Sequence, residues 1–115
     1  MALDWLLAQG LLADGSYAQA GALLDEILPD ARRLESPSRW GLMLMVRAVT
    51  RPHVPASPAR AELQEALAAA RNASDLVVLG YVLSHFGLFL CVDGDATRAR
   101  ALHEEMLALA RSLAR

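Results

Sequence analysis

The chain has 115 residues with 11 basic and 13 acidic side chains, so its formal net charge is −2. This length suits a single domain, and the slightly acidic balance argues against a protein that binds nucleic acid. All the basic residues are Arg, and the single cysteine, Cys91, excludes a disulfide within the chain, so we expect a reducing, cytoplasmic location.

Ala and Leu dominate the chain, and because both residues have high helix propensity we expect an all-α fold with six helices. The first helix covers about residues 3–13, where leucines recur at helical spacing. Gly15 is expected to end it in the left-handed conformation, and Ser16 to cap the second helix. Pro29 is expected to kink or end that second helix, with one more turn over residues 31–35.

Prolines mark the starts of the next two helices. Pro is well suited to the first turn of a helix, so we expect Ser36-Pro37 and Ser57-Pro58 each to begin one. A stiff loop with three prolines, residues 51–58, separates the two. We expect the last four helices over about residues 37–50, 58–71, 74–92 and from 96 to the end of the chain.

The segment from Leu76 to Val92 is the most apolar part of the chain. It is shorter than the roughly 20 residues that span a bilayer, and Ser84 and His85 interrupt it. We therefore expect a buried helix in a bundle and no membrane span. His85 is expected to find a backbone or side-chain partner, and the alternative is a polar anchor in a ligand groove.

A short segment recurs with a period of about 40 residues, which is typical of stacked two-helix repeats. The copies are Gly15-Ser16-Tyr17-Ala18-Gln19-Ala20 and Gly94-Asp95-Ala96-Thr97-Arg98-Ala99, with Ala59-Arg60-Ala61 between them. In both outer copies a small residue, Ala8 or Gly87, precedes the turn glycine at the same spacing. In the middle copy the proline loop replaces the glycine turn, and the small position falls on Arg47 or, with a shift of one residue, on Ala48.

With these small residues, the chain resembles the tetratricopeptide (TPR) family. The long period and the phrase from Gly94 to Arg111 look like the divergent repeats of LuxR- or MalT-like bacterial regulators. The resemblance implies three antiparallel helix pairs, six helices in all, stacked as a short right-handed superhelix. One TPR-like domain would then cover residues 1–115, with repeats over about 1–35, 36–73 and 74–115. We expect either a stand-alone repeat protein or a piece of a larger regulator.

No combination of residues in the sequence predicts an enzyme. His103-Glu104-Glu105 lacks the second His of a zinc-protease motif, and no pair of titratable groups is placed for acid–base chemistry. Asp93 and Asp95 with His103 could form a metal site, but Asp beside a turn glycine more often caps a helix. We therefore expect neither catalysis nor a cofactor nor a metal.

The fifth helix is apolar on nearly every face, so its neighbours cannot cover it completely. We expect the uncovered strip to line a groove together with residues of the first and third helices, and an exposed apolar groove marks an interaction site. The predicted groove residues are Trp5, Leu12, Leu44, Tyr81, Ser84, Leu88 and Cys91.

The predicted function is a scaffold in a bacterial regulatory system that binds a protein or peptide partner or self-associates as a dimer. The last helix keeps Leu109 and Leu113 near its end without a polar capping helix after it, which favours self-association or a bound partner. The alternative is a sensing module that holds a small apolar molecule in the groove. We expect contact with neither nucleic acid nor a membrane. The sequence also allows an alternative fold, a loose helical bundle without stacked repeats.

Overall fold

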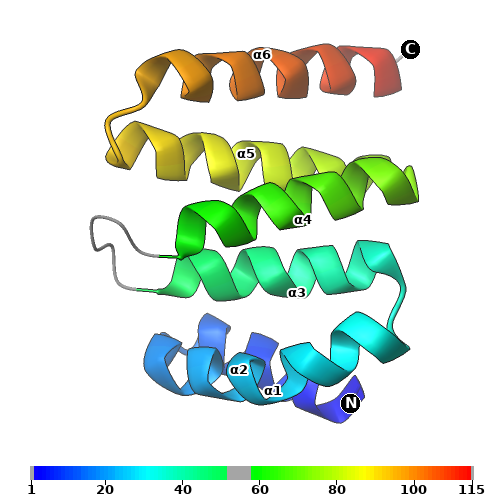
Figure 1. Cartoon of the computed structure of the whole chain (residues 1–115), viewed down its shortest axis with the longest axis vertical. Helices are drawn as coiled ribbons and strands as arrows, with labels where there is room; N and C mark the ends of the chain where they lie inside the picture. The colour runs from blue at the N-terminus through cyan, green and yellow to red at the C-terminus, as the bar shows by residue number, and fades with distance from the viewer. Residues whose placement is uncertain (1, 52–57, 115) are drawn as a thin grey trace.

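The computed structural model of the chain describes residues 2–51 and 58–114, with side chains from Asp4 onward (Figure 1). These residues form six α-helices and no strand, which confirms the predicted all-α class. The helices are α1 (Ala2–Ala13), α2 (Tyr17–Leu34), α3 (Pro37–Thr50), α4 (Ala59–Ala73), α5 (Leu76–Val92) and α6 (Ala96–Leu113).

Each helix packs against the next one along the chain, and α5 also packs against α3. In Figure 1 the helices α3 to α6 lie as successive layers, with α1 and α2 at the end of the stack opposite α6. We call α1–α2, α3–α4 and α5–α6 the first, second and third pair. The antiparallel pairing and the right-handed superhelical twist stay predictions.

The turns between paired helices follow the local sequence. Gly15 and Gly94 have φ angles of +82° and +87°, which confirms the left-handed conformation predicted for Gly15. A side chain at either position would be strained, because L-residues rarely adopt this backbone conformation. Ser16 occupies the cap position of α2, but its hydroxyl does not cap the helix and instead donates to Oδ2 of Asp14 at 3.4 Å.

Within residues 2–51 and 58–114, three helices begin with a side-chain cap. Oγ of Ser36 accepts a hydrogen bond from the amide of Arg39 at 3.2 Å. The carboxylates of Asp75 and Asp95 accept in the same way from amides three residues on, at 3.1 and 3.3 Å. Each cap satisfies an amide that has no partner within its own helix.

Two predicted boundaries differ from the structure. Of the two effects predicted for Pro29, a kink or an end of the helix, the end does not occur, because α2 continues through Pro29 to Leu34. Pro29 lacks an amide hydrogen and breaks one backbone bond, but the burial of Ala31 in the core holds the last turns in place. The fourth helix begins at Ala59 and not at Pro58, which occupies the cap position, while Ser57 lies outside the described residues.

The core consists of two apolar clusters. The smaller one joins the first pair to α3 through Trp5, Ala8, Leu24, Ile27, Ala31 and Met43. The larger one lies among α3, α4, α5 and α6, and its fully buried large side chains are Leu63, Val82, Leu83, Phe86 and Leu90. Trp40 contacts both clusters, and the Arg32 guanidinium lies 5.1 Å from the centre of its ring. No polar or charged residue is buried among the described residues.

Each pair places two small residues in its interior. They are Ala8 and Ala20 in the first pair, Ala48 and Ala59 in the second, and Gly87 and Ala99 in the third, and all six are buried. The second pair therefore uses Ala48, the shifted alternative, at the small position. The other candidate, Arg47, belongs to a contact with α2.

Arginine–carboxylate pairs join neighbouring elements around the core. Nε and Nη2 of Arg47 lie 2.6 and 2.9 Å from the two carboxylate oxygens of Asp25 on α2. Arg60 on α4 donates to Asp95 and to Asp93 in the turn before α6, the latter at 3.5 Å. These pairs fix the positions of side chains, but exposed ion pairs contribute only about 0–1 kcal/mol each.

A Cβ added at Gly87 would collide with the imidazole of His103, whereas a Cβ at Gly10 would meet nothing. Gly10→Ala should therefore stabilise the protein by about 0.5–1 kcal/mol, because Ala loses less backbone entropy in a helix. Gly87→Ala should be clearly less favourable than Gly10→Ala, because the partly exposed imidazole of His103 must move away from the new Cβ. In a His103→Ala background the same Gly87→Ala change should become neutral or stabilising. Urea unfolding of the unchanged protein, of Gly87→Ala, of His103→Ala and of the double variant measures the coupling between the two positions. Equal stabilisation by Gly87→Ala and by Gly10→Ala would contradict the predicted collision with His103.

Three aspartates make the fold sensitive to acid. Hydrogen bonds from Arg47, Ser38 and Arg60 lower the pKa of Asp25, Asp75 and Asp95 respectively below the usual value. A lowered folded-state pKa contributes stability above the unfolded pKa of about 3.9, and that stability is lost as pH falls through the folded pKa.

The melting temperature should therefore change little between about pH 7 and 5 and fall steeply below about pH 4. Asp95→Asn keeps a residue that can cap α6 but removes the titrating group. It should lower the melting temperature at pH 7 and flatten its dependence on pH. An Asp95→Asn variant with the same acid slope as the unchanged protein would contradict this assignment.

Candidate binding grooves

An exposed stripe runs along α5. Tyr81, Ser84, Leu88 and Cys91 recur at helical spacing and therefore share one face. The exposed fractions of Tyr81 and Leu88 are 54% and 57%, Cys91 is exposed and Ser84 is half-buried. The other faces of α5 pack on α3, α4 and α6. Four of the predicted groove residues thus lie together on the uncovered face of this helix.

A groove separates the first helix of the first pair from that of the second. Within the described residues the backbone of α1 does not lie close to the backbone of α3, whereas α3 packs directly on α5. The resulting hollow, which we call the α1–α3 groove, has a volume of about 410 Å³. It is lined by Trp5, Gln9, Leu12, Leu42, Met45, Val46 and Tyr81. It brings together three predicted residues, Trp5, Leu12 and Tyr81.

The α1–α3 groove continues toward the other end of α3. A neighbouring hollow shares Leu12, Met45 and Val46 with it and extends to Val49 and His85. Nδ1 of His85 lies 2.8 Å from the carbonyl oxygen of Tyr81, so the backbone supplies the partner that was predicted for this histidine. The trough formed by both hollows is mainly apolar.

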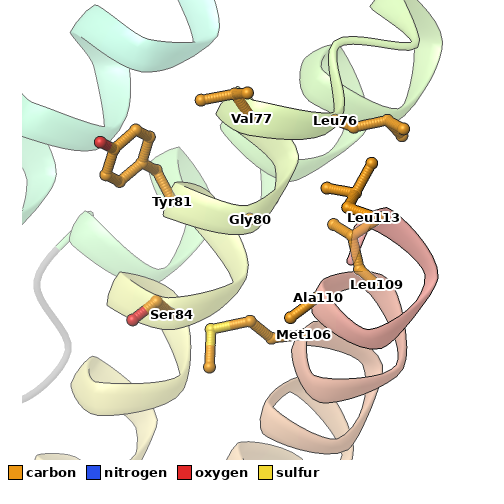
Figure 2. A pocket seen from close by; sticks show the side chains of 9 residues that line it. All are labelled: Leu76, Val77, Gly80, Tyr81, Ser84, Met106, Leu109, Ala110 and Leu113. Carbon is orange, nitrogen blue, oxygen red and sulfur yellow. The ribbon is translucent and has the colours of Figure 1, made fainter. Parts of the chain in front are cut away.

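A second hollow, the α5–α6 groove, opens between the two helices of the third pair (Figure 2). It has a volume of about 350 Å³ and is lined by Leu76, Val77, Gly80, Tyr81, Ser84, Met106, Leu109, Ala110 and Leu113. Figure 2 shows Leu109 and Leu113 of α6 pointing toward Leu76, while Tyr81 points from α5 away from α6. Tyr81 borders both grooves, so the two apolar surfaces meet at this residue.

The structure places Leu44 in the larger core cluster, where it is 7% exposed, and not along either groove. Trp5 is equally buried, yet one side of it borders the α1–α3 groove. Leu88 and Cys91 continue the stripe of α5 beyond the residues that line the two grooves.

Sequence reasoning missed the contribution of α3 to the groove. Its wall is formed by Leu42, Met45 and Val46, and the neighbouring hollow adds Val49. These residues follow the spacing i, i+3, i+4, i+7, which is the pattern of an apolar helix face and was present in the sequence. The prediction selected Leu44 from the opposite face of the same helix.

The charged groups that could suggest another site have partners within the chain. Arg33 lies 3.1 Å from Asp30, and Arg39 lies 3.8 Å from Glu35. Asp93 and Asp95 contact Arg60, and across residues 2–51 and 58–114 no three His, Cys, Asp or Glu side chains gather where a metal could bind. In the same part of the chain, every helix is too short or too polar to cross a membrane.

Comparison with protein families, with curated proteins and with solved structures finds no match to this chain. The grooves are therefore interpreted from their own geometry and chemistry.

The exposure of Tyr81 gives a direct test of its place on the surface. Tyr81→Ala should change the free energy of unfolding by less than about 0.5 kcal/mol, because more than half of the side chain is in water. Phe86→Ala, five residues further along the same helix, should cost about 3–5 kcal/mol because Phe86 is fully buried. Urea unfolding followed by circular dichroism measures both. A Tyr81→Ala cost close to that of Phe86→Ala would place Tyr81 in the core.

Proposed function

We propose that the chain is a TPR-like helical-repeat scaffold without enzymatic activity, and that it binds a segment of a partner protein in the α1–α3 groove. The observation that carries this proposal is an open apolar trough whose two walls come from α1 and α3, with Tyr81 of α5 at its edge. Such a trough can accept a side-chain row of a helix or an extended peptide.

The lining favours a protein segment with apolar anchors. Leu42 and Val46 of α3 are half-buried, so part of each side chain can contact a bound segment, while Met45 beneath them is 3% exposed and belongs to the core. Tyr81 offers a broad ring that can cover a partner side chain while its hydroxyl stays in water. Gln9 is the one amide in the wall, and it can pair with a backbone group of the bound segment.

The small residues inside each pair support the resemblance to TPR proteins, because they occur at matching positions in all three pairs. We extend the proposal to a role in a bacterial regulatory system on the resemblance of the segment from Gly94 to Arg111. In such a system the groove would recruit a partner, and the two helix pairs on either side of it would hold the groove open.

The size of the two grooves favours one further candidate, the sensing of a small apolar molecule. Volumes of about 350 and 410 Å³ lie at the lower end of the range of small-molecule sites, which is about 300–1,000 Å³. Native and denaturing mass spectrometry of the purified protein separates the two functions. A small molecule that is retained in the native spectrum and released on denaturation would favour sensing.

Peptide binding is tested with a displayed library of 12-residue peptides, followed by fluorescence anisotropy of the selected sequences. We expect peptides with apolar residues at helical or alternating spacing. Tyr81→Glu should weaken them at least about tenfold, because a buried apolar anchor contributes about 1.5–3 kcal/mol. Leu34→Glu on α2 is the matched control, because Leu34 is similarly exposed but lies outside both grooves. Selected peptides that bind the Tyr81→Glu and Leu34→Glu variants equally well would overturn the proposal.

A further inference from the structure

The third pair carries a large share of the apolar surface of the molecule. Among the described residues, seven of the twelve large apolar side chains that are exposed belong to α5 and α6. They are Leu76, Val77, Tyr81, Leu88, Val92, Leu107 and Leu113. We call the α5–α6 groove together with Leu107 the end face, while Leu88 and Val92 belong to the exposed stripe of α5. A surface of this kind marks an interaction site, because single exposed apolar residues are common but clusters of them are not.

Equivalent positions in the three pairs indicate what kind of element the end face binds. Eleven residues after the buried Ala20, Ala59 and Ala99 stand Ala31, Ala70 and Ala110. The first two are fully buried, whereas Ala110 is exposed and lines the α5–α6 groove. In the first two pairs the next helix packs on this side, α3 on α2 and α5 on α4. The end face therefore continues a series of helix-binding surfaces, and a helix is the element that fits it.

The second helix of the third pair also carries an ordered set of charges. Arg100, Glu104, Leu107 and Arg111 stand at intervals of four, three and four residues, so they share one face of α6. Leu107 is 48% exposed, and the side chains of Arg100 and Glu104 are more exposed still. Within the described part of the chain, Arg111 forms no ion pair, while Glu104 reaches only Arg100 at 3.8 Å.

This order of charges is complementary to itself. When two copies of α6 lie antiparallel about a two-fold axis near Leu107, residues that stand equally far before and after the axis face each other. The midpoint of Glu104 and Arg111 falls between Leu107 and Ala108, so an axis at this point makes the two charged residues equidistant from it. Each Glu104 then lies beside Arg111 of the second copy, and the two Leu107 side chains meet at the axis. Two identical ion pairs would flank an apolar centre, which is the arrangement of an isologous interface.

We propose that the end face binds a second copy of this chain, as a closed dimer with its two-fold axis near Leu107. The dimer supplies each end face with the helix that α3 and α5 supply to the earlier pairs. It covers Leu107 and the α5–α6 groove, and it gives Arg111 an acidic partner. The α1–α3 groove is lined mainly by α1 and α3 and shares Tyr81 with the α5–α6 groove, whereas the dimer axis lies near Leu107 on α6, so a dimer of this kind can also bind a peptide.

A head-to-tail assembly is the competing arrangement of identical chains. Leu6 and Leu7 are exposed on α1, at the opposite end of the stack, and could dock on the end face of the next copy. In such an assembly each added copy presents its own free end face to the next copy. The copies therefore form open chains, or rings when the last copy meets the first. The charge order on α6 favours the closed dimer, because it pairs with itself and needs no complementary charges on α1.

Analytical ultracentrifugation from about 1 to 100 µM measures the assembly, a range that covers the dissociation constants of weak and moderate dimers. We expect a single species of twice the 12.4 kDa chain mass at the upper concentrations. Leu107→Glu should weaken the dimer at least about tenfold, because two carboxylates would meet at the axis. Leu34→Glu, at a leucine of α2 that is still more exposed (67% against 48% for Leu107), should leave it unchanged. Circular dichroism confirms that both variants are folded.

A charge exchange tests the register. Glu104→Arg and Arg111→Glu should each dimerise poorly alone, because each variant brings two like charges together. When these two variants are mixed, a mixed dimer should form with an affinity close to that of the unchanged protein. The double variant Glu104→Arg/Arg111→Glu should dimerise again by itself.

Three results would overturn the proposal. The first is a chain that stays monomeric at about 100 µM, which excludes any dimer of moderate affinity. The second is a mixture of the two charge variants that associates no better than either alone. The third is growth beyond the dimer that Leu7→Glu abolishes, which would establish head-to-tail assembly. None of these variants alters the α1–α3 groove, so failure of the dimer leaves the peptide-binding test intact.

Discussion

The burial of α5 is the constraint on which the rest of the structure depends. This helix is apolar on nearly every face, and it packs on α3, α4 and α6 at once. Val82, Leu83, Phe86 and Leu90 are fully buried within it, and each buried side chain of this size contributes about 1.5–3 kcal/mol relative to an exposed one. The second and third pairs are therefore arranged around α5 as one cluster, while in the described residues the first pair joins them through the packing of α2 on α3 and through the small core cluster of Trp5, Ala8 and Met43.

The difference between these two junctions creates the α1–α3 groove. Since α1 does not approach α3 as closely as α3 approaches α5, apolar residues of both helices remain along a trough. At the other end of the stack, α5 and α6 have no following helix in the described part of the chain, and the end face results. Both apolar surfaces are thus consequences of where the close packing of helix pairs stops, and they meet at Tyr81.

Charged side chains orient the helices around this core. Arg47 reaches Asp25 across the junction of the first two pairs, and Gly21 leaves the space, because a Cβ there would lie 3.1 Å from Nη1 of Arg47. Arg60 ties α4 to the turn before α6 through Asp93 and Asp95. These pairs add little free energy individually but favour one register of the helices over others. They also give the two aspartates of the turn a structural role.

The sequence by itself determined the six helices, the glycine turns and the small residues inside the pairs, because these depend on residues close together in the chain or on a regular period. It also indicated the exposed stripe of α5 through Tyr81 and Leu88. Only the tertiary structure decided that Leu44 is in the core, that Leu42 and Val46 line the groove, and that α2 continues through Pro29. Helical periodicity defines the faces of a helix, but which apolar face stays uncovered depends on how closely separate helix pairs approach one another.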